Sequence, residues 1–206
     1  MKSRIRGLYA VTPDGLEDRE LQAKVEAALR GGAKLVQYRN KQGPPEVQRR
    51  QLRALLALCR RHDVPLIVND DPRLAAEIGA DGVHVGGEDP PVAAARAALG
   101  PNAIIGASCY DALDRAHAAR EAGASYVAFG SVFPSTVKPD AVRAPLALLR
   151  EAKNQVGLPV VAIGGITIGN APQAVAAGAD AIAVISALFH ASDVCRAARK
   201  LSKPFE

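Results

Sequence analysis

The chain repeats a short pattern in which a Gly-Ala pair closes an alanine-rich stretch and opens an apolar run. Its four copies begin at Gly32, Gly79, Gly123 and Gly178. Glycine adopts positive φ without a steric penalty, so it commonly ends a helix and turns the chain back. Each copy therefore predicts a helix that ends and a strand that follows it. The copies recur at intervals of roughly 45–55 residues, which is about the length of two strand-helix units.

Further apolar runs lie between the copies of this pattern, at residues 8–11, 66–68, 104–107 and 160–163. Stretches with apolar residues at helical spacing follow the strands, for example at 21–30, 47–61 and 146–156. Strands that alternate regularly with helices favour a parallel sheet. Eight such units predict α/β architecture, as a single (β/α)8 TIM barrel that forms one catalytic domain over residues 1–206. A doubly wound parallel sheet is the alternative.

The composition agrees with a compact α/β domain and argues against several other classes of protein. Hydrophobic residues make up 49% of the chain, which indicates a well-packed core rather than disorder. The cysteines, Cys59, Cys109 and Cys195, are widely separated, so they predict neither disulfides nor a zinc site. Because the sequence has no recognisable signal peptide and no membrane-spanning run, we expect a cytoplasmic protein without a membrane partner.

The net charge of +5 is mild and comes largely from arginines on the predicted helices. Basic tracts interleaved with aromatic residues, which nucleic-acid binding would require, are missing. A small anionic substrate fits this charge at least as well. We therefore expect small-molecule substrates and no nucleic-acid partner, and a homo-oligomer is compatible with this composition.

The apolar run at 66–68 ends abruptly on Asn69, Asp70 and Asp71. Unpaired carboxylates are rarely buried, and the carboxyl ends of barrel strands are where active sites lie. Asp71 precedes a proline and is therefore interpreted as the N-cap of the next helix. Asp70 and Asp89 follow neighbouring strands, so both acids could reach one divalent cation such as Mg²⁺. Asp89 is equally suited to cap the helix that begins at a Pro-Pro pair.

Gln37, Arg39 and Lys41 alternate at the end of the second predicted strand. Extended backbone directs alternate side chains to the same side. Three hydrogen-bond donors, two of them cationic, suit an anion such as a diphosphate. This strand end is therefore a candidate binding site for a phosphorylated substrate.

The remaining strand ends carry further candidates. His84 alternates toward the barrel interior, where it is more typical of a hydrogen-bonded core histidine than of a catalyst. Ser108 follows the fifth predicted strand, and the long hydroxyl- and lysine-bearing segment 129–138 is typical of a substrate loop. Gly165 and Ser186 follow the last two strands, where barrels commonly bind phosphate through backbone N–H groups.

Taken together, these residues resemble the thiamine-phosphate synthase family. The motifs occur in the family's order, span nearly the whole chain and are jointly specific. They are Tyr9-Ala-Val-Thr12, Gln37-x-Arg39-x-Lys41, Asn69-Asp70, Gly82-Val-His-Val-Gly86 with Asp89, Ile105-Gly-Ala-Ser108, Ser135-Thr136-x-Lys138, Ala162-Ile-Gly-Gly-Ile166 and Ala183-Val-Ile-Ser186. The resemblance implies a transferase that joins hydroxymethylpyrimidine diphosphate to hydroxyethylthiazole phosphate, with Mg²⁺ as cofactor. The products are thiamine monophosphate and pyrophosphate.

The resemblance also implies a role for individual residues. The expected Mg²⁺ ligands are Asp70 and Asp89. The residues expected to stabilise the departing diphosphate or to contact the reacting pyrimidine are Arg39, Lys41, Ser108 and Lys138. Further contacts to the pyrimidine diphosphate are expected from Gln37, Tyr38, Asn40 and Asn69. Contacts to the thiazole phosphate are expected from Ser135, Thr136, Val137, Gly165, Ile185 and Ser186.

The chain departs from the family pattern in three places. Val137 stands where the substrate loop usually has a threonine, so one hydroxyl contact is missing there. Asn40 replaces a common acid, and Gly87 replaces a common glutamine. Two alternatives follow, a related thiazole tautomerase and a non-catalytic phosphate-binding barrel. The first lacks the diphosphate and metal residues that this chain keeps.

Overall fold

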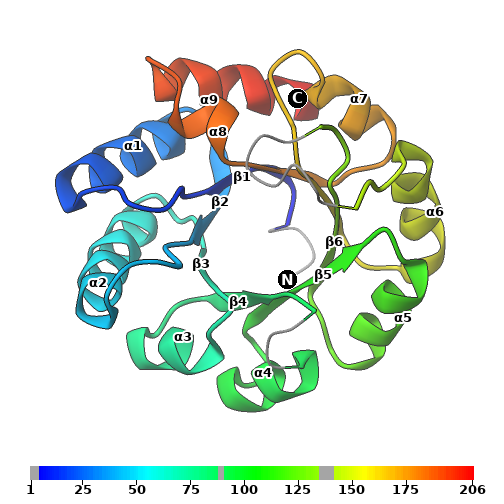
Figure 1. Ribbon diagram of the computed structural model, residues 1–206, viewed down its shortest axis with the longest axis horizontal. Helices are drawn as coiled ribbons and strands as arrows, with labels where there is room; N and C mark the ends of the chain where they lie inside the picture. Colours follow the sequence, from blue (N-terminus) through cyan, green and yellow to red (C-terminus); the bar gives the residue numbers. More distant parts are fainter. Residues whose placement is uncertain (1–4, 88–90, 135–141) are drawn as a thin grey trace.

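Eight parallel strands close into a barrel in which each strand pairs with the next one along the chain (Figure 1). The computed structural model describes residues 5–87, 91–134 and 142–206. The strands are β1 (Gly7–Val11), β2 (Ala33–Tyr38), β3 (Leu66–Asn69), β4 (Gly82–Val85), β5 (Ile104–Tyr110), β6 (Tyr126–Phe129), β7 (Val160–Ile163) and β8 (Ala181–Val184). The barrel closes where Gly7 of β1 lies opposite Ala181 of β8. The predicted TIM barrel is therefore confirmed, and a doubly wound sheet is excluded.

Helices form a ring around the outside of the barrel (Figure 1). They are α1 (Asp18–Arg30), α2 (Pro45–Arg61), α3 (Pro72–Ile78), α4 (Val92–Leu99), α5 (Leu113–Glu121), α6 (Leu146–Val156), α7 (Ala171–Ala176), α8 (Ser186–Phe189) and α9 (Val194–Ser202), followed by the 3₁₀ turn η2 (Lys203–Phe205). All four glycines of the repeated pattern have positive φ, between 71° at Gly79 and 113° at Gly178. Each one precedes a strand, as the sequence predicts. Among the described residues, none of the helices combines the length and apolar character needed to cross a membrane.

The apolar residues form two layers separated by the barrel wall. The larger layer lies between strands and helices, with Leu52 and Leu55 of α2 among its fully buried members. The smaller layer fills the barrel interior and includes Tyr9, Leu35 and Tyr126. Alternation along each strand produces this division, because successive side chains point to opposite faces. The interior therefore receives every second residue of each strand, and polar residues at those positions face one another.

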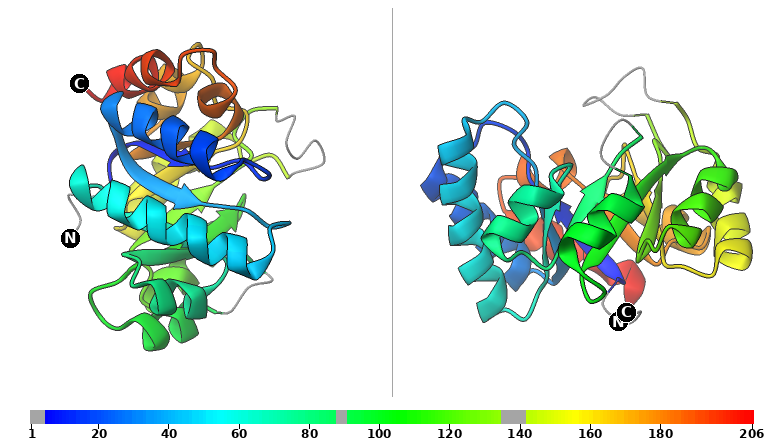
Figure 2. Two further views of the ribbon diagram at one scale, coloured as in Figure 1. Left: turned by 90° about the vertical axis from the view of Figure 1, so that its left-hand side faces the viewer. Right: turned by 90° about the horizontal axis from the view of Figure 1, so that it is seen from below.

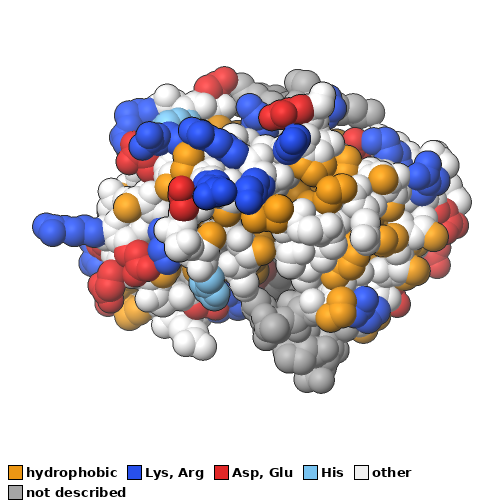
Figure 3. Space-filling model, turned by 90° about the horizontal axis from the view of Figure 1, so that it is seen from above, with side chains coloured by type: hydrophobic (Ala, Val, Ile, Leu, Met, Phe, Trp, Pro, Cys, Tyr) orange, Lys and Arg blue, Asp and Glu red, His pale blue; other side chains and the backbone are white. Residues whose placement is uncertain are grey.

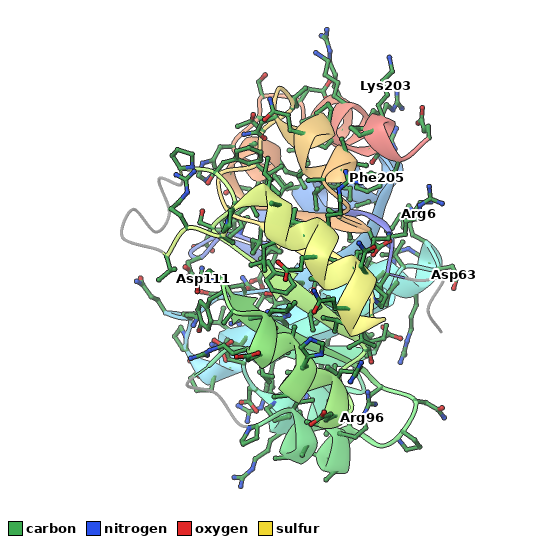
Figure 4. The ribbon with its side chains drawn as sticks, turned by 90° about the vertical axis from the view of Figure 1, so that its right-hand side faces the viewer. Arg6, Asp63, Arg96, Asp111, Lys203 and Phe205 are labelled. Atoms are coloured by element: carbon green, nitrogen blue, oxygen red, sulfur yellow. The ribbon has the colours of Figure 1, made fainter. Side chains whose placement is uncertain are left out.

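The two ends of the barrel differ in what they carry. Arg6 donates a hydrogen bond to the carbonyl oxygen of Phe205 at 3.2 Å, which joins the start of β1 to the end of η2. Figure 4 shows these two residues on one side of the molecule and Asp111, which directly follows β5, on the other. Figure 2 shows the same barrel from two further directions. The carboxyl ends of the strands, where the candidate site lies, are thus remote from Arg6 and Phe205.

Much of the positive charge lies on the helical surface. Figure 3 shows Lys and Arg side chains gathered over the face that carries α9 in Figure 1. Arg196, Arg199 and Lys200 of α9 are all exposed. The net charge of the chain therefore does not by itself describe the charge of the candidate site.

Candidate active site at the carboxyl ends of the strands

A cavity of about 290 Å³ opens at the carboxyl ends of the barrel strands. Its volume is near the lower end of the range for small-molecule sites. Several residues that the sequence analysis predicts as site residues line this cavity, namely Gln37, Arg39, Lys41, Asn69, Asp70, Ser108 and Ile185. Residues that are far apart in sequence thus converge, because parallel strands of a barrel end on one face.

A pair of cations lies on the β2 side of this cavity. The hydroxyl of Thr12 accepts a hydrogen bond from the Arg39 backbone N–H at 2.8 Å and donates to the Arg39 carbonyl at 3.0 Å. The Asp14 carboxylate forms an ion pair with the Arg39 guanidinium and accepts a bond from the Lys41 backbone N–H at 2.7 Å. The segment after β1 therefore holds the segment after β2. Asp14 is absent from the residues expected from sequence.

The three polar residues that end β3 have different environments. Asn69 and Asp70 line the cavity, and the Asp70 carboxylate lies 2.7 Å from Lys41 Nζ. Asp70 has a φ of 65°, and its backbone N–H donates to the His84 carbonyl at 2.8 Å. Asp71 instead caps α3, since its carboxylate accepts bonds from the N–H groups of the second and third helical residues, each at 2.9 Å. The interpretation of Asp71 as an N-cap is confirmed.

Five polar side chains form a continuous hydrogen-bonded chain across the barrel interior. Gln37 Nε2 donates to Tyr9 Oη at 2.8 Å, and Tyr9 Oη lies 2.8 Å from Tyr126 Oη. His84 Nδ1 lies 2.9 Å from Tyr126 Oη, and His84 Nε2 lies 2.9 Å from Ser108 Oγ. We call this set the interior network. It comprises Gln37, Tyr9, Tyr126, His84 and Ser108.

Burial keeps the interior network uncharged. It raises the pKa values of Tyr9 and Tyr126 above the ordinary value for tyrosine. Burial also lowers the pKa of His84 to about 4, against a smaller opposite effect from the negative charge of Asp70. The expectation that His84 is a hydrogen-bonded interior residue agrees with these contacts. The two tyrosines were missed as site residues, although alternation along β1 and β6 could have placed them inside.

A second hollow of about 190 Å³ adjoins the cavity near β7 and β8. Gly165, Ile185 and Ser186 line it, and it shares Ile163 and Gly164 with the cavity. Gly165 has a φ of 64°, and a β-carbon there would collide with the carbonyl oxygen of Pro134. The turn is therefore one that glycine alone accommodates easily.

Comparison with known protein families identifies the family of this chain. The family described as thiamine monophosphate synthase matches residues 8–188. The chain belongs to the thiamine monophosphate synthase family. This confirms the resemblance inferred from the motifs.

Individual members of the thiamine monophosphate synthase family match almost the whole chain. A thiamine-phosphate synthase of Chromobacterium violaceum is 57% identical over 98% of this chain and 97% of its own length. A thiamine-phosphate synthase of Methylococcus capsulatus is 55% identical over 97% of this chain and 89% of its own length. The solved thiamine phosphate pyrophosphorylase from Pyrococcus furiosus has a TM-score of 0.87 and 38% identity, covering 98% of this chain and 96% of that one.

Some residues expected from the thiamine monophosphate synthase resemblance line an adjoining hollow, which shares Lys41, Asn69 and Asp70 with the cavity, or fall outside the described chain. Alternation on β2 directs Tyr38 away from Gln37, and the Tyr38 hydroxyl donates to Gln51 of α2 at 2.7 Å. Asn40 also contacts Gln51, at 3.3 Å, and neither Tyr38 nor Asn40 lines the central cavity. The predicted residues that fall outside the described ranges are Asp89, Ser135, Thr136, Val137 and Lys138.

Proposed function

We propose that the chain condenses hydroxymethylpyrimidine diphosphate with hydroxyethylthiazole phosphate to give thiamine monophosphate and pyrophosphate. The observation that supports this most strongly is that two regions suited to anions belong to one connected space. Arg39 and Lys41 line one part of it. The hollow beside Gly165 adjoins another part through shared wall residues. Two phosphorylated substrates can therefore meet between them.

The reaction that fits this space is a dissociative substitution. The bond between the pyrimidine methylene carbon and the diphosphate oxygen breaks, and its electron pair leaves with the oxygen. The thiazole nitrogen then donates its lone pair to the methylene carbon. No proton moves in either step, so the site needs no general base. This agrees with a site whose histidine, His84, is engaged by Tyr126 and Ser108.

In this proposal, positively charged side chains stabilise the departing diphosphate. Arg39 and Lys41 would bind its oxygens and stabilise the negative charge that develops on them. Asn69 and Gln37 line the same part of the cavity and would hold the pyrimidine diphosphate in place. Ser108 would contact the pyrimidine ring, and Lys138 would bind the leaving pyrophosphate.

The residues also fit a Mg²⁺ ion bound together with the diphosphate. The described residues include no group of three or more metal-ligating side chains, which is the arrangement of an all-protein metal site. Mg²⁺ instead commonly binds to one or two carboxylates plus substrate phosphates, and Asp70 supplies a carboxylate inside the cavity. We propose Asp70 and Asp89 as its ligands. The ion would neutralise charge on the diphosphate and so make it a better leaving group.

The hollow between β7 and β8 would take the thiazole phosphate. Gly165 permits close approach of a ligand to the backbone, and Ser186 begins α8 beside it. The segment at 135–137 would complete this site. The side chain of Asn170 braces the turn, since it donates to the Gly165 carbonyl at 3.0 Å and accepts from the Thr167 N–H at 2.7 Å.

A condensation assay tests the proposed function. Purified protein is mixed with both substrates and Mg²⁺, and thiamine monophosphate and pyrophosphate are measured. We expect the two products in equal amounts, and none when either substrate or Mg²⁺ is omitted. Absence of thiamine monophosphate would overturn the proposal. Isomerisation of a thiazole phosphate without the pyrimidine substrate would instead identify the related tautomerase activity.

A further inference from the structure

With the Gln37 amide nitrogen facing Tyr9 Oη, the interior network has one arrangement of hydrogens that satisfies every member. Gln37 places its amide nitrogen, which is only a donor, against Tyr9 Oη. The proton of Tyr9 must then point to Tyr126, because the described structure gives Tyr9 no other hydrogen-bond acceptor. By the same reasoning the proton of Tyr126 points to His84 Nδ1. The direction of each hydrogen bond thus follows from the one before it.

The tautomer of His84 follows from this direction. Since Nδ1 accepts a hydrogen bond, the ring carries its single proton on Nε2 and donates it to Ser108 Oγ. A doubly protonated ring would donate to Tyr126 and, with Tyr9 also donating to Tyr126, would leave the Tyr126 proton without an acceptor. Ser108 therefore receives a hydrogen bond from His84, and its own proton is free to point into the cavity.

The two ends of the interior network present opposite hydrogen-bonding character. Ser108 lines the cavity and offers a hydroxyl proton. Gln37 also lines the cavity, and with its nitrogen engaged by Tyr9 it offers its amide oxygen. A ligand between them must give a hydrogen bond to Gln37 and accept one from Ser108. An aminopyrimidine meets both demands, with its exocyclic amino group and a ring nitrogen, whereas an oxopyrimidine places an acceptor where the amino group would be.

We infer that Tyr9, Tyr126 and His84 are positioning residues that fix Gln37 as an acceptor and Ser108 as a donor, and so select an aminopyrimidine ring. This inference rests on the proposed function, which places the pyrimidine in this part of the cavity. Gly106 contributes to the device, since a β-carbon there would collide with the Tyr126 ring and with His84 Nδ1. The interior network thereby links two substrate contacts that come from β2 and β5.

Kinetics of Tyr126→Phe test the inference, with Ser125→Ala as a matched control. The first variant breaks the interior network while keeping the ring. The second removes the neighbouring hydroxyl, which bonds the Ile105 N–H at 3.1 Å outside the cavity. We expect Tyr126→Phe to raise KM for the pyrimidine diphosphate about tenfold, with the KM for the thiazole phosphate unchanged. Ser125→Ala should alter neither KM. An equal rise in both KM values, or no rise, would overturn the inference.

The preference of the protein for an amino over an oxo pyrimidine gives a second measurement. A purely structural role of Tyr126 would leave this preference unchanged. The amino substrate and its oxo counterpart, each as the methyl diphosphate, are compared as ligands by titration. We expect the wild-type protein and Ser125→Ala to prefer the amino ring, and Tyr126→Phe to lose about tenfold of that preference. An unchanged preference in Tyr126→Phe would contradict the role given to the interior network.

The tautomer of His84 can be measured without any turnover. The chain has four histidines, so nitrogen NMR of labelled protein is tractable, with His84→Gln used for assignment. We expect the proton on Nε2 in the wild-type protein and a mixture of tautomers in Tyr126→Phe. A proton on Nδ1 in the wild type would overturn the inference even if thiamine monophosphate is formed. Conversely, an inactive protein with the expected tautomer would refute the proposed function alone.

Discussion

The adjacent acids Asp70 and Asp71 allow a test at the scale of single residues. Asp70→Ala removes the proposed Mg²⁺ ligand, so we expect condensation to fall by about two orders of magnitude or more. Asp70→Asn should fall similarly, and it keeps a residue that tolerates the φ of 65° at this position. Steady-state rates at saturating Mg²⁺ measure this. Rates like those of the wild type in either variant would contradict the metal assignment.

Asp71→Ala is the matched control for Asp70, because it removes a carboxylate from the next position. Loss of the Asp71 carboxylate leaves two backbone N–H groups of α3 without their hydrogen-bond acceptor. We expect the free energy of unfolding to fall by about 1 kcal/mol, with unchanged kinetics. The two variants thus separate a loss of chemistry from a loss of stability.

Asp14 is expected to act through the two cations that it holds. Its carboxylate pairs with Arg39 and accepts the Lys41 N–H. We predict that Asp14→Asn lowers kcat/KM for the pyrimidine diphosphate about tenfold, since both cations lose part of their orientation. Its side chain is 30% exposed, so the free energy of unfolding should change by less than about 1 kcal/mol.

The control for Asp14 is Asp18→Asn, which weakens a pair with Arg50 on the outer surface. It should leave kcat/KM unchanged. Equal kinetic effects in the two variants would show that Asp14 has no special relation to the site.

At the scale of elements, alanine substitutions at Gly165, in the turn after β7, and at Gly157 should distinguish steric conflict from backbone strain. Gly165 and Gly157 have similar positive φ values, 64° and 70°. A β-carbon at Gly157 would meet nothing within 4 Å, whereas at Gly165 it would collide with the Pro134 carbonyl. We predict that Gly157→Ala costs about 1 kcal/mol of stability through strain alone. Gly165→Ala should in addition raise KM for the thiazole phosphate about tenfold or more.

Substrate-specific kinetics and denaturant unfolding of both glycine variants check this prediction. The thiazole phosphate is the diagnostic substrate, because its proposed hollow contains Gly165. A Gly165→Ala variant with unchanged KM for this substrate would exclude the turn from the binding site.

At the scale of the whole molecule, local sequence patterns predicted most of the fold. The Gly-Ala repeat and the apolar runs located the strands, because strand and helix endings depend on nearby residues. The fifth predicted strand ends with its apolar run at residue 107, whereas β5 continues to Tyr110 through a register shift beside Ser108. Such an irregularity arises from pairing with β6, which lies far along the chain. It places Ser108 within a strand instead of after one.

The same distinction between local and distant determinants applies to the site. Residues that end strands, such as Arg39 and Asp70, could be predicted to line one cavity because a barrel brings every strand end to one face. Asp14 and the Tyr9–Tyr126 pair were missed, since their importance depends on partners 25 or more positions away. The Tyr38 side chain faces α2, as strand alternation predicts, and its contact with substrate stays a prediction.

The interior network should also make the barrel sensitive to acid. The pKa of His84 is about 4 when folded, against 6.5 for an ordinary histidine, mainly because burial disfavours the charged ring. The folded state therefore binds this proton more weakly than the unfolded chain does. The stability that depends on neutral His84 is fully present above pH 6.5 and is lost as the pH falls toward 4. That loss amounts to about 3 kcal/mol.

Denaturant unfolding between pH 7 and 4, in the presence of EDTA, measures this loss. The groups that face the His84 ring are Tyr126 and Ser108, with the charge of Asp70 nearby. His84→Gln cannot titrate at this position, so its stability should fall less steeply, by about 3 kcal/mol less over the same range. Subtracting the two curves removes the contribution of the carboxylates, which titrate in both proteins. Parallel curves would mean that His84 is already able to take up a proton in the folded barrel.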